Sequence, residues 1–142
     1  MPTAAGLFFE DLSEGQSASY AKTVSEADIV LFAGVSGDTN PVHLDQSYAE
    51  TTMFKSRIAH GMLSAGFIST VLGTKLPGPG AIYLSQSLKF KAPVRIGDTV
   101  VATATVTGLD AAKKRATLAT VCKVGDTVVI DGEAVVMVPS RA

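Results

Sequence analysis

The stretch His60–Gly80, HGMLSAGFISTVLGTKLPGPG, separates two parts of the chain that differ in periodicity. From Gly61 to Lys75 the residues are apolar on nearly every side of a helix, which is typical of a central buried helix. The LPGPG that follows ends the helix abruptly, because proline cannot continue the helical hydrogen bonds. We therefore predict one long central helix, with a change of secondary structure after it.

After this helix the pattern changes to that of β-strands. The segment 81–94, AIYLSQSLKFKAPV, alternates so that one face of a strand carries four large apolar residues: Ile82, Leu84, Leu88 and Phe90. Three further segments are rich in Val and Thr and are separated by turn residues: 98–109, 114–124 and 127–138. The residues between the last two indicate a tight hairpin at 124–127.

Before the central helix, the pattern predicts one strand and two short helices. The strand is SASYAKTV, residues 17–24. Ser25 is a candidate N-cap for a helix that Gly37 would end, and Asp45 a candidate N-cap for a second helix to about residue 50. A strand, helices and four more strands indicate an α+β domain, with the helices on one face of an antiparallel sheet. Such a sheet exposes an edge that a dimer could close.

Composition sets the class of protein. The 142 residues suit one domain over the whole chain, and 46% hydrophobic with 18% charged residues is too apolar for a disordered protein. A net charge of -1 gives no general attraction to nucleic acid or an anionic membrane. The only cysteine, Cys122, cannot form an internal disulfide, and the N-terminus lacks a signal-peptide pattern. We expect a cytoplasmic protein with no membrane span.

The segment GDTNPVH, residues 37–43, has two interpretations. Pro41 forces a turn, which the side chains of Asp38 and Asn40 can stabilise by accepting backbone hydrogen bonds. The same bend can also aim Asp38 and His43 at one point, where a carboxylate and an imidazole form a general acid–base pair able to hold a water. Spacing alone does not decide between them.

Gly61 favours the second interpretation. It stands at the predicted start of the buried helix, where its N–H would be a free donor suited to an oxyanion. An ordinary helix start explains the same residue. An acid–base pair, an oxyanion donor and an apolar helix together would suit chemistry next to a thioester carbonyl.

Residues 32–49, FAGVSGDTNPVHLDQSYA, resemble the signature of MaoC-like (R)-specific enoyl-CoA hydratases, which have the hot-dog fold. The core G-D-x-N-P-[LIV]-H is complete. The similarity continues through AHGML (59–63), LPGPGAIYLSQSLKFKAPVRIGD (76–98) and GEAVV (132–136). The resemblance implies a single hot-dog domain, with an antiparallel sheet wrapped around the long helix and a short overhanging helical segment that carries the catalytic turn.

The resemblance also implies an activity: reversible addition of water to a trans-2-enoyl-CoA, giving the (R)-3-hydroxyacyl-CoA. Asp38 and His43 would activate the water, the Gly61 N–H would bind the thioester oxygen, and Asn40 would orient the turn. Ser69 and Leu72 would line the acyl pocket. Three basic residues could meet the CoA phosphates or could simply be solvated: Lys89, Lys91 and Arg95. A homodimer or higher homo-oligomer is implied, with the sheets of two copies pairing.

Other functions fit less of the sequence. Dehydration of (R)-3-hydroxyacyl thioesters on acyl carrier protein is the same chemistry, and a hot-dog thioesterase or acyl-CoA binder is a third possibility. Binding alone needs no acid–base pair. We expect no metal and no cofactor, because the two histidines are far apart in sequence and no C-x-x-C, P-loop or dinucleotide motif is present.

Overall fold

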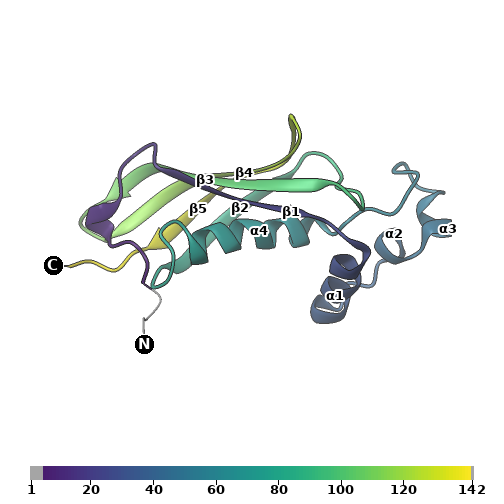
Figure 1. Ribbon diagram of the computed structural model, residues 1–142, viewed down its shortest axis with the longest axis horizontal. Helices are drawn as coiled ribbons and strands as arrows, with labels where there is room; N and C mark the ends of the chain where they lie inside the picture. The colour runs from purple at the N-terminus through teal and green to yellow at the C-terminus, as the bar shows by residue number, and fades with distance from the viewer. Residues whose placement is uncertain (1–4, 142) are drawn as a thin grey trace.

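The computed structural model describes residues 5–141, which form one five-stranded sheet with a long helix against it (Figure 1). All strand pairs are antiparallel, in the order β1-β3-β4-β5-β2. The strands are β1 Ser17–Thr23, β2 Ile82–Phe90, β3 Thr99–Asp110, β4 Arg115–Val124 and β5 Thr127–Met137. The helices are η1 Phe9–Asp11, α1 Glu26–Ser36, α2 Pro41–Leu44, α3 Gln46–Ala49 and α4 Gly61–Thr74.

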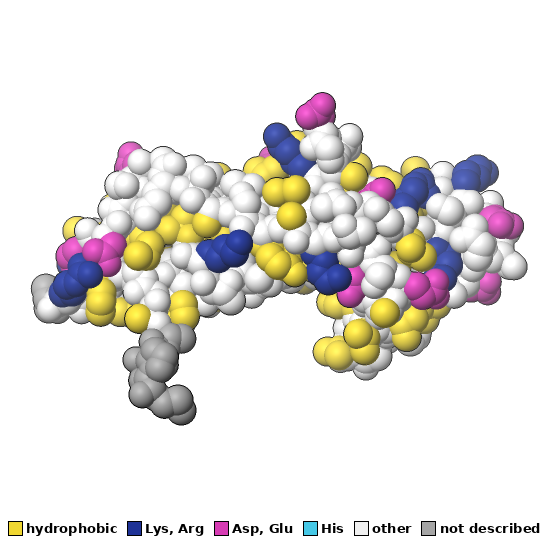
Figure 2. Space-filling view, in the orientation of Figure 1, with side chains coloured by type: hydrophobic (Ala, Val, Ile, Leu, Met, Phe, Trp, Pro, Cys, Tyr) yellow, Lys and Arg dark blue, Asp and Glu magenta, His cyan; other side chains and the backbone are white. Residues whose placement is uncertain are grey.

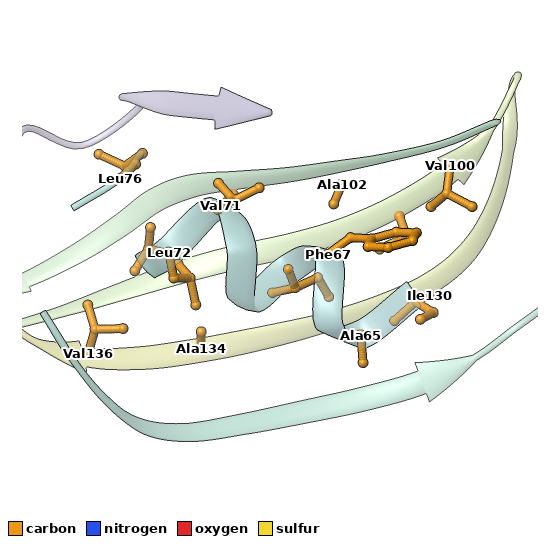
Figure 3. Packing of buried hydrophobic residues seen from close by; sticks show 14 of the residues in the cluster. Ala65, Phe67, Val71, Leu72, Leu76, Val100, Ala102, Ile130, Ala134 and Val136 are labelled. Carbon is orange, nitrogen blue, oxygen red and sulfur yellow. The ribbon is translucent and has the colours of Figure 1, made fainter. Parts of the chain in front are cut away.

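Helix α4 packs along the concave face of the sheet, and the core lies between them (Figure 3). Ile68, Val71 and Leu72 are at most 2% exposed. Val71 and Leu72 lie over small or β-branched residues of the strands (Figure 3). Burial of this apolar surface is the main driving force for folding. The predicted central helix and antiparallel sheet are therefore confirmed, in the hot-dog arrangement.

Cys122 belongs to the same core and is fully buried. Its Sγ lies 3.6 Å from the carbonyl oxygen of Ser64, and burial raises the pKa of its thiol to about 11. A thiol that stays protonated at neutral pH is a poor nucleophile. Cys122 therefore acts as a small buried hydrophobe.

Helices α1, α2 and α3 lie beyond the end of the sheet at which α4 begins (Figure 1). Ser25 caps α1 as predicted: its side chain accepts the N–H of Asp28, whose carboxylate in turn accepts the N–H of Ser25. Gly37 ends the helix with φ 78°, a left-handed conformation that favours glycine. Asp45 caps α3 by accepting the N–H of Tyr48 at 3.2 Å, also as predicted.

Strand β2 is at the edge of the sheet and differs from the predicted one-sided strand. Its register with β5 shifts within residues 83–85, which interrupts the alternation. Phe90 pairs with Ile130, on the core face, whereas Ile82 pairs with Met137, which is 36% exposed. Directly paired residues lie on the same face of a sheet. The prediction that the four large apolar residues share one face is therefore wrong at Ile82.

Several exposed apolar side chains gather on each of two elements. One is β2, where Ile82, Leu84 and Phe90 are 51%, 42% and 55% exposed. The other is α1, over which Figure 2 shows a cluster of hydrophobic side chains. Among the helices formed by residues 5–141, none is long and apolar enough to cross a bilayer.

Candidate active site

The turn between α1 and α2 is built as the sequence predicts. The Oδ1 of Asp38 accepts the N–H of Asn40 at 3.3 Å, and the Oδ1 of Asn40 accepts the N–H of Val42 at 3.1 Å. Pro41 occupies the first position of α2, where its missing N–H is not needed. The turn that we predicted is therefore followed by a one-turn helix, which carries His43.

His43 is buried, with its imidazole held in one tautomer. Its Nδ1 lies 2.8 Å from the carbonyl oxygen of Ile58, which can only accept, so Nδ1 carries the proton and Nε2 has a free lone pair. Burial lowers the pKa of His43 from its ordinary value of 6.5, and His60 adds to this shift, whereas the bond to Ile58 and the charge of Asp38 oppose it. His43 is therefore neutral at neutral pH.

His60 is a site residue that the sequence analysis missed. It lies immediately before α4, and its ring stacks on that of His43 with 3.8 Å between centroids and 29° between planes. Its Nε2 donates to the main-chain carbonyl of Asp38 at 2.8 Å. A second histidine beside the predicted oxyanion donor was the available signal, but its proximity to His43 depends on the tertiary fold.

The three residues predicted for catalysis come together around one cavity of about 240 Å³, lined by Asp38, His43, His60, Gly61, Met62 and Phe90. Gly61 is the first residue of α4, so its N–H has no acceptor within the helix. A Cβ at Gly61 would lie 2.5 Å from the ring of Phe90, which shows how closely that ring covers the helix start. A carboxylate, a neutral imidazole and a free N–H thus surround one small space.

The geometry of the two histidines does not suit a shared metal ion. The potential ligand atoms of Asp38, His43 and His60 lie within 4.8 Å of one another. The separation of the two histidines in sequence, on which we based the expectation of no metal site, therefore does not keep them apart in the fold. However, two histidine ligands of a tetrahedral zinc have ring centroids about 5 Å apart, because each Zn–N bond is about 2 Å and lies in its ring plane. The stacked rings are 3.8 Å apart.

The residues predicted to bind substrate lie in different environments: some are exposed and one is in the core. Ser69 is exposed on α4 and lines a groove of about 490 Å³ between α4 and β2, whereas Leu72 is 2% exposed in the core. Lys89 and Lys91 are exposed, and Lys91 lies 4.0 Å from Asp131.

Arg95 is held by the protein itself. Its guanidinium donates to the carbonyl oxygen of Phe54 at 2.8 Å and to the hydroxyl of Ser56. These contacts tie the segment before α4 to the end of the sheet. Among the described residues, Arg95 therefore has a structural role.

A second cavity of about 320 Å³ adjoins the first and shares His60, Gly61 and Phe90 with it. Its other walls are mainly apolar, from residues 53–54, 58–59, 92–94 and 129–130, and Ser64 and Lys91 also line it. The two cavities meet where the N-terminus of α4 is exposed. A substrate could therefore extend from the catalytic residues into an apolar channel.

Comparison with known proteins shows the family of this chain. The family description "MaoC like domain" matches residues 9–130. An (R)-specific enoyl-CoA hydratase of Rhodospirillum rubrum is 72% identical, over 94% of this chain and 93% of that protein. A 3-hydroxybutyryl-CoA dehydratase of Methylorubrum extorquens is 52% identical, over 99% of this chain and 90% of that protein.

Solved structures agree as well. The unliganded R-hydratase PhaJ1 of Pseudomonas aeruginosa has a TM-score of 0.90 at 47% identity, covering 96% of this chain and 88% of that chain. The (R)-hydratase of A. caviae involved in PHA biosynthesis has a TM-score of 0.89 at 46% identity, covering 92% and 99%. By sequence and by fold, this protein belongs to the MaoC-like (R)-specific enoyl-CoA hydratase family.

Proposed function

We propose that this protein is an (R)-specific enoyl-CoA hydratase, which adds water reversibly to a trans-2-enoyl-CoA to give the (R)-3-hydroxyacyl-CoA. The observation that carries the proposal is the neutral imidazole of His43, whose free Nε2 shares one cavity with the carboxylate of Asp38 and the N–H of Gly61. Hydratases of this activity are among the similar proteins, at up to 72% identity.

In the proposed mechanism, Asp38 and His43 hold the water between them. Its oxygen forms a bond to the β-carbon of the enoyl group while one of its O–H bonds breaks, and the pair takes up that proton. The π electrons move toward the thioester, whose oxygen gains enolate charge and is stabilised by the Gly61 N–H in the dipole field of α4. A proton then passes from the pair to the α-carbon, so the pair ends as it began.

We propose further that Ser69 contributes to the acyl pocket, because it lines the groove between α4 and β2. Of the three basic residues predicted to meet CoA phosphates, Lys91 is the best placed, since it lines the cavity next to the catalytic residues. Arg95 is committed to Phe54 and Ser56. Leu72 would affect acyl length only indirectly, through packing beneath α4.

We also propose that the working unit is a homodimer in which the β2 strands of two copies pair. Within residues 5–141, β2 is paired on one side only, and this edge strand carries large exposed apolar side chains, an arrangement that promotes strand addition. Tyr83 and Leu84 of this strand also line the groove that contains Ser69. Pairing at β2 would therefore help to close the proposed acyl pocket.

The test is the ultraviolet absorbance of crotonyl-CoA after addition of the purified protein, with Asp38→Asn as the control. Loss of the conjugated-enoyl signal without release of free thiol, strongly reduced in the variant, is the expected result. Chiral analysis of the product then tests the (R) assignment. Thiol release would indicate a thioesterase instead, and activity only with an acyl-carrier-protein thioester would indicate the carrier-protein dehydratase.

A further inference from the structure

His60 contacts both members of the proposed acid–base pair and is itself 2% exposed. Its Nε2 lies 2.8 Å from the main-chain oxygen of Asp38. Because a carbonyl oxygen can only accept, Nε2 carries the proton, and Nδ1 is unprotonated in the neutral ring. The bond holds the backbone of Asp38 at the point where the turn leaves α1.

The second contact of His60 is with the ring of His43. The two imidazoles stack at 3.8 Å, and Phe32 packs on His60 with 4.8 Å between centroids. The imidazole of His43 is thus held by the carbonyl of Ile58 at Nδ1 and by His60 at its face. Packing that restricts a ring in this way keeps a catalytic nitrogen in place without a direct contact to substrate.

The remaining nitrogen of His60, Nδ1, takes no part in either contact. Nδ1 is buried and has no hydrogen-bond partner among residues 5–141. The charged or titratable groups around the two rings are Asp38 itself, Arg57, whose Nε donates to the carbonyl of His43, and Lys91, which lines the neighbouring cavity.

We propose that His60 is a positioning residue of the active site, which fixes Asp38 through its main-chain carbonyl and His43 through ring stacking. This inference rests on the proposed hydratase function and adds a residue to its site. His60 acts on the reaction only through the two residues that it holds. Its hydrogen bond and its stacked ring are separate functions, and separate substitutions remove them.

Two variants separate the effect of the hydrogen bond from the effect of the stacked ring. His60→Phe keeps a flat ring over His43 and loses the donor to Asp38, whereas His60→Gln keeps an N–H near the position of Nε2 and loses the ring. For His60→Phe we expect kcat with crotonyl-CoA to fall about 10- to 100-fold with little change in KM, because a displacement of about 1 Å at a catalytic group can cost roughly 100-fold. His60→Gln should retain more of kcat.

The pH profile gives the readout that a purely structural role would not change. Loss of the ring in His60→Gln exposes His43 to water, which should raise the pKa of His43 toward its ordinary value. The acid limb of kcat/KM should then move to higher pH, and it should move less in His60→Phe, which keeps the site buried. The NMR titration of His43 should shift in the same direction, and this measurement needs no catalysis.

The outcomes separate the inference from the function on which it rests. If the unchanged protein does not hydrate enoyl-CoA, the proposed function fails, and the His43 titration still tests the contact with His60. If both variants keep the activity and the pH profile of the parent, His60 has no positioning role. Equal losses in both variants, matched by the loss of folded protein in thermal melts and with an unchanged pH profile, would also overturn the inference. Should His60→Phe not fold, His60→Gln and its pH profile decide alone.

Discussion

In the proposed mechanism, His43 can act as a base only while its Nε2 carries no proton, and two features of the site maintain that state. The carbonyl of Ile58 orients the ring, and burial disfavours its charged form. Asp38, on the exposed turn, supplies the negative charge beside it. The division of roles follows from environment: one group is oriented and neutral, and the other is a carboxylate open to the cavity.

The pH dependence of hydration should reflect this lowered pKa. Because the pKa of His43 lies below 6.5, its neutral form persists as the pH falls past 6.5, and activity is lost only as the pH passes through the lowered value. The acid limb of kcat/KM for crotonyl-CoA should therefore lie below pH 6.5. Above this acid limb, His43→Gln should reduce kcat by about 10²- to 10⁴-fold. An acid limb at or above 6.5 would contradict this account of His43.

Gly61 provides a second test at the residue scale. In Gly61→Ala the new Cβ would lie 2.5 Å from the ring of Phe90, which lines the catalytic cavity, so that ring or the start of α4 must shift. We expect kcat to fall at least about tenfold, because the donor of α4 is displaced or covered. The double variant Gly61→Ala/Phe90→Ala should recover part of this loss, measured against Phe90→Ala alone. Full activity in Gly61→Ala would remove Gly61 from the mechanism.

At the scale of elements, local signals predicted most of the architecture. Ser25, Gly37 and Asp45 act at helix ends as their residue types predict, and residues 125–126 form the predicted hairpin turn, with Gly125 at φ 58°. These features depend on neighbours within four residues. Most of the candidate site could also be predicted from the sequence, because residues 37–43 carry most of it in one turn.

Features that depend on distant partners were missed. The bulge that reverses the face of Ile82 arises in the pairing of β2 with β5, which are about 50 residues apart in sequence. The stacking of His60 on His43 likewise requires that the chain return over 17 residues to the same point.

One local feature was missed as well. At Pro41 the sequence analysis predicts a turn and no helix, although proline at the first position of a helix is common.

Arg57 links the elements that carry the site, and its loss should affect catalysis. Its Nε donates to the carbonyl of His43 at 2.7 Å, and its Nη1 pairs with Glu26 of α1 at 2.8 Å. Arg57→Met should lower both kcat and the melting temperature, because the buried carbonyl at the end of α2 loses its donor. Glu26→Gln is the matched control: Glu26 is 62% exposed, so this pair contributes little, and the bond to His43 remains. Equal effects of the two substitutions would show that the ion pair, and not the bond to His43, matters.

At the scale of the whole molecule, β1 and β2 are the two edge strands of the sheet, and β2 is the one that we propose a second copy pairs with. In Ile82, Leu84 and Phe90, β2 exposes large apolar side chains beside an unpaired row of backbone groups. A stable dimer buries about 1,200–2,000 Å² in total, and pairing along β2 extended over the α4 groove is a natural route to that area. The hydrophobic surface of α1 lies at the same end of the molecule as the catalytic turn (Figures 1 and 2).

Charge on this edge should therefore separate the protomers. In Leu84→Glu, pairing of two copies would place a carboxylate in a desolvated contact, which is unfavourable without a partner. We expect sedimentation velocity to show a dimer for the parent protein and a monomer for the variant. Val101→Glu is the control, because Val101 is similarly exposed but lies on β3, inside the sheet, and should leave the dimer intact. Since Leu84 also lines the groove with Ser69, the monomer should lose activity most with longer acyl chains, whose distal carbons reach furthest from His43. A dimeric Leu84→Glu protein would place the interface elsewhere, with the apolar surface of α1 as the next candidate.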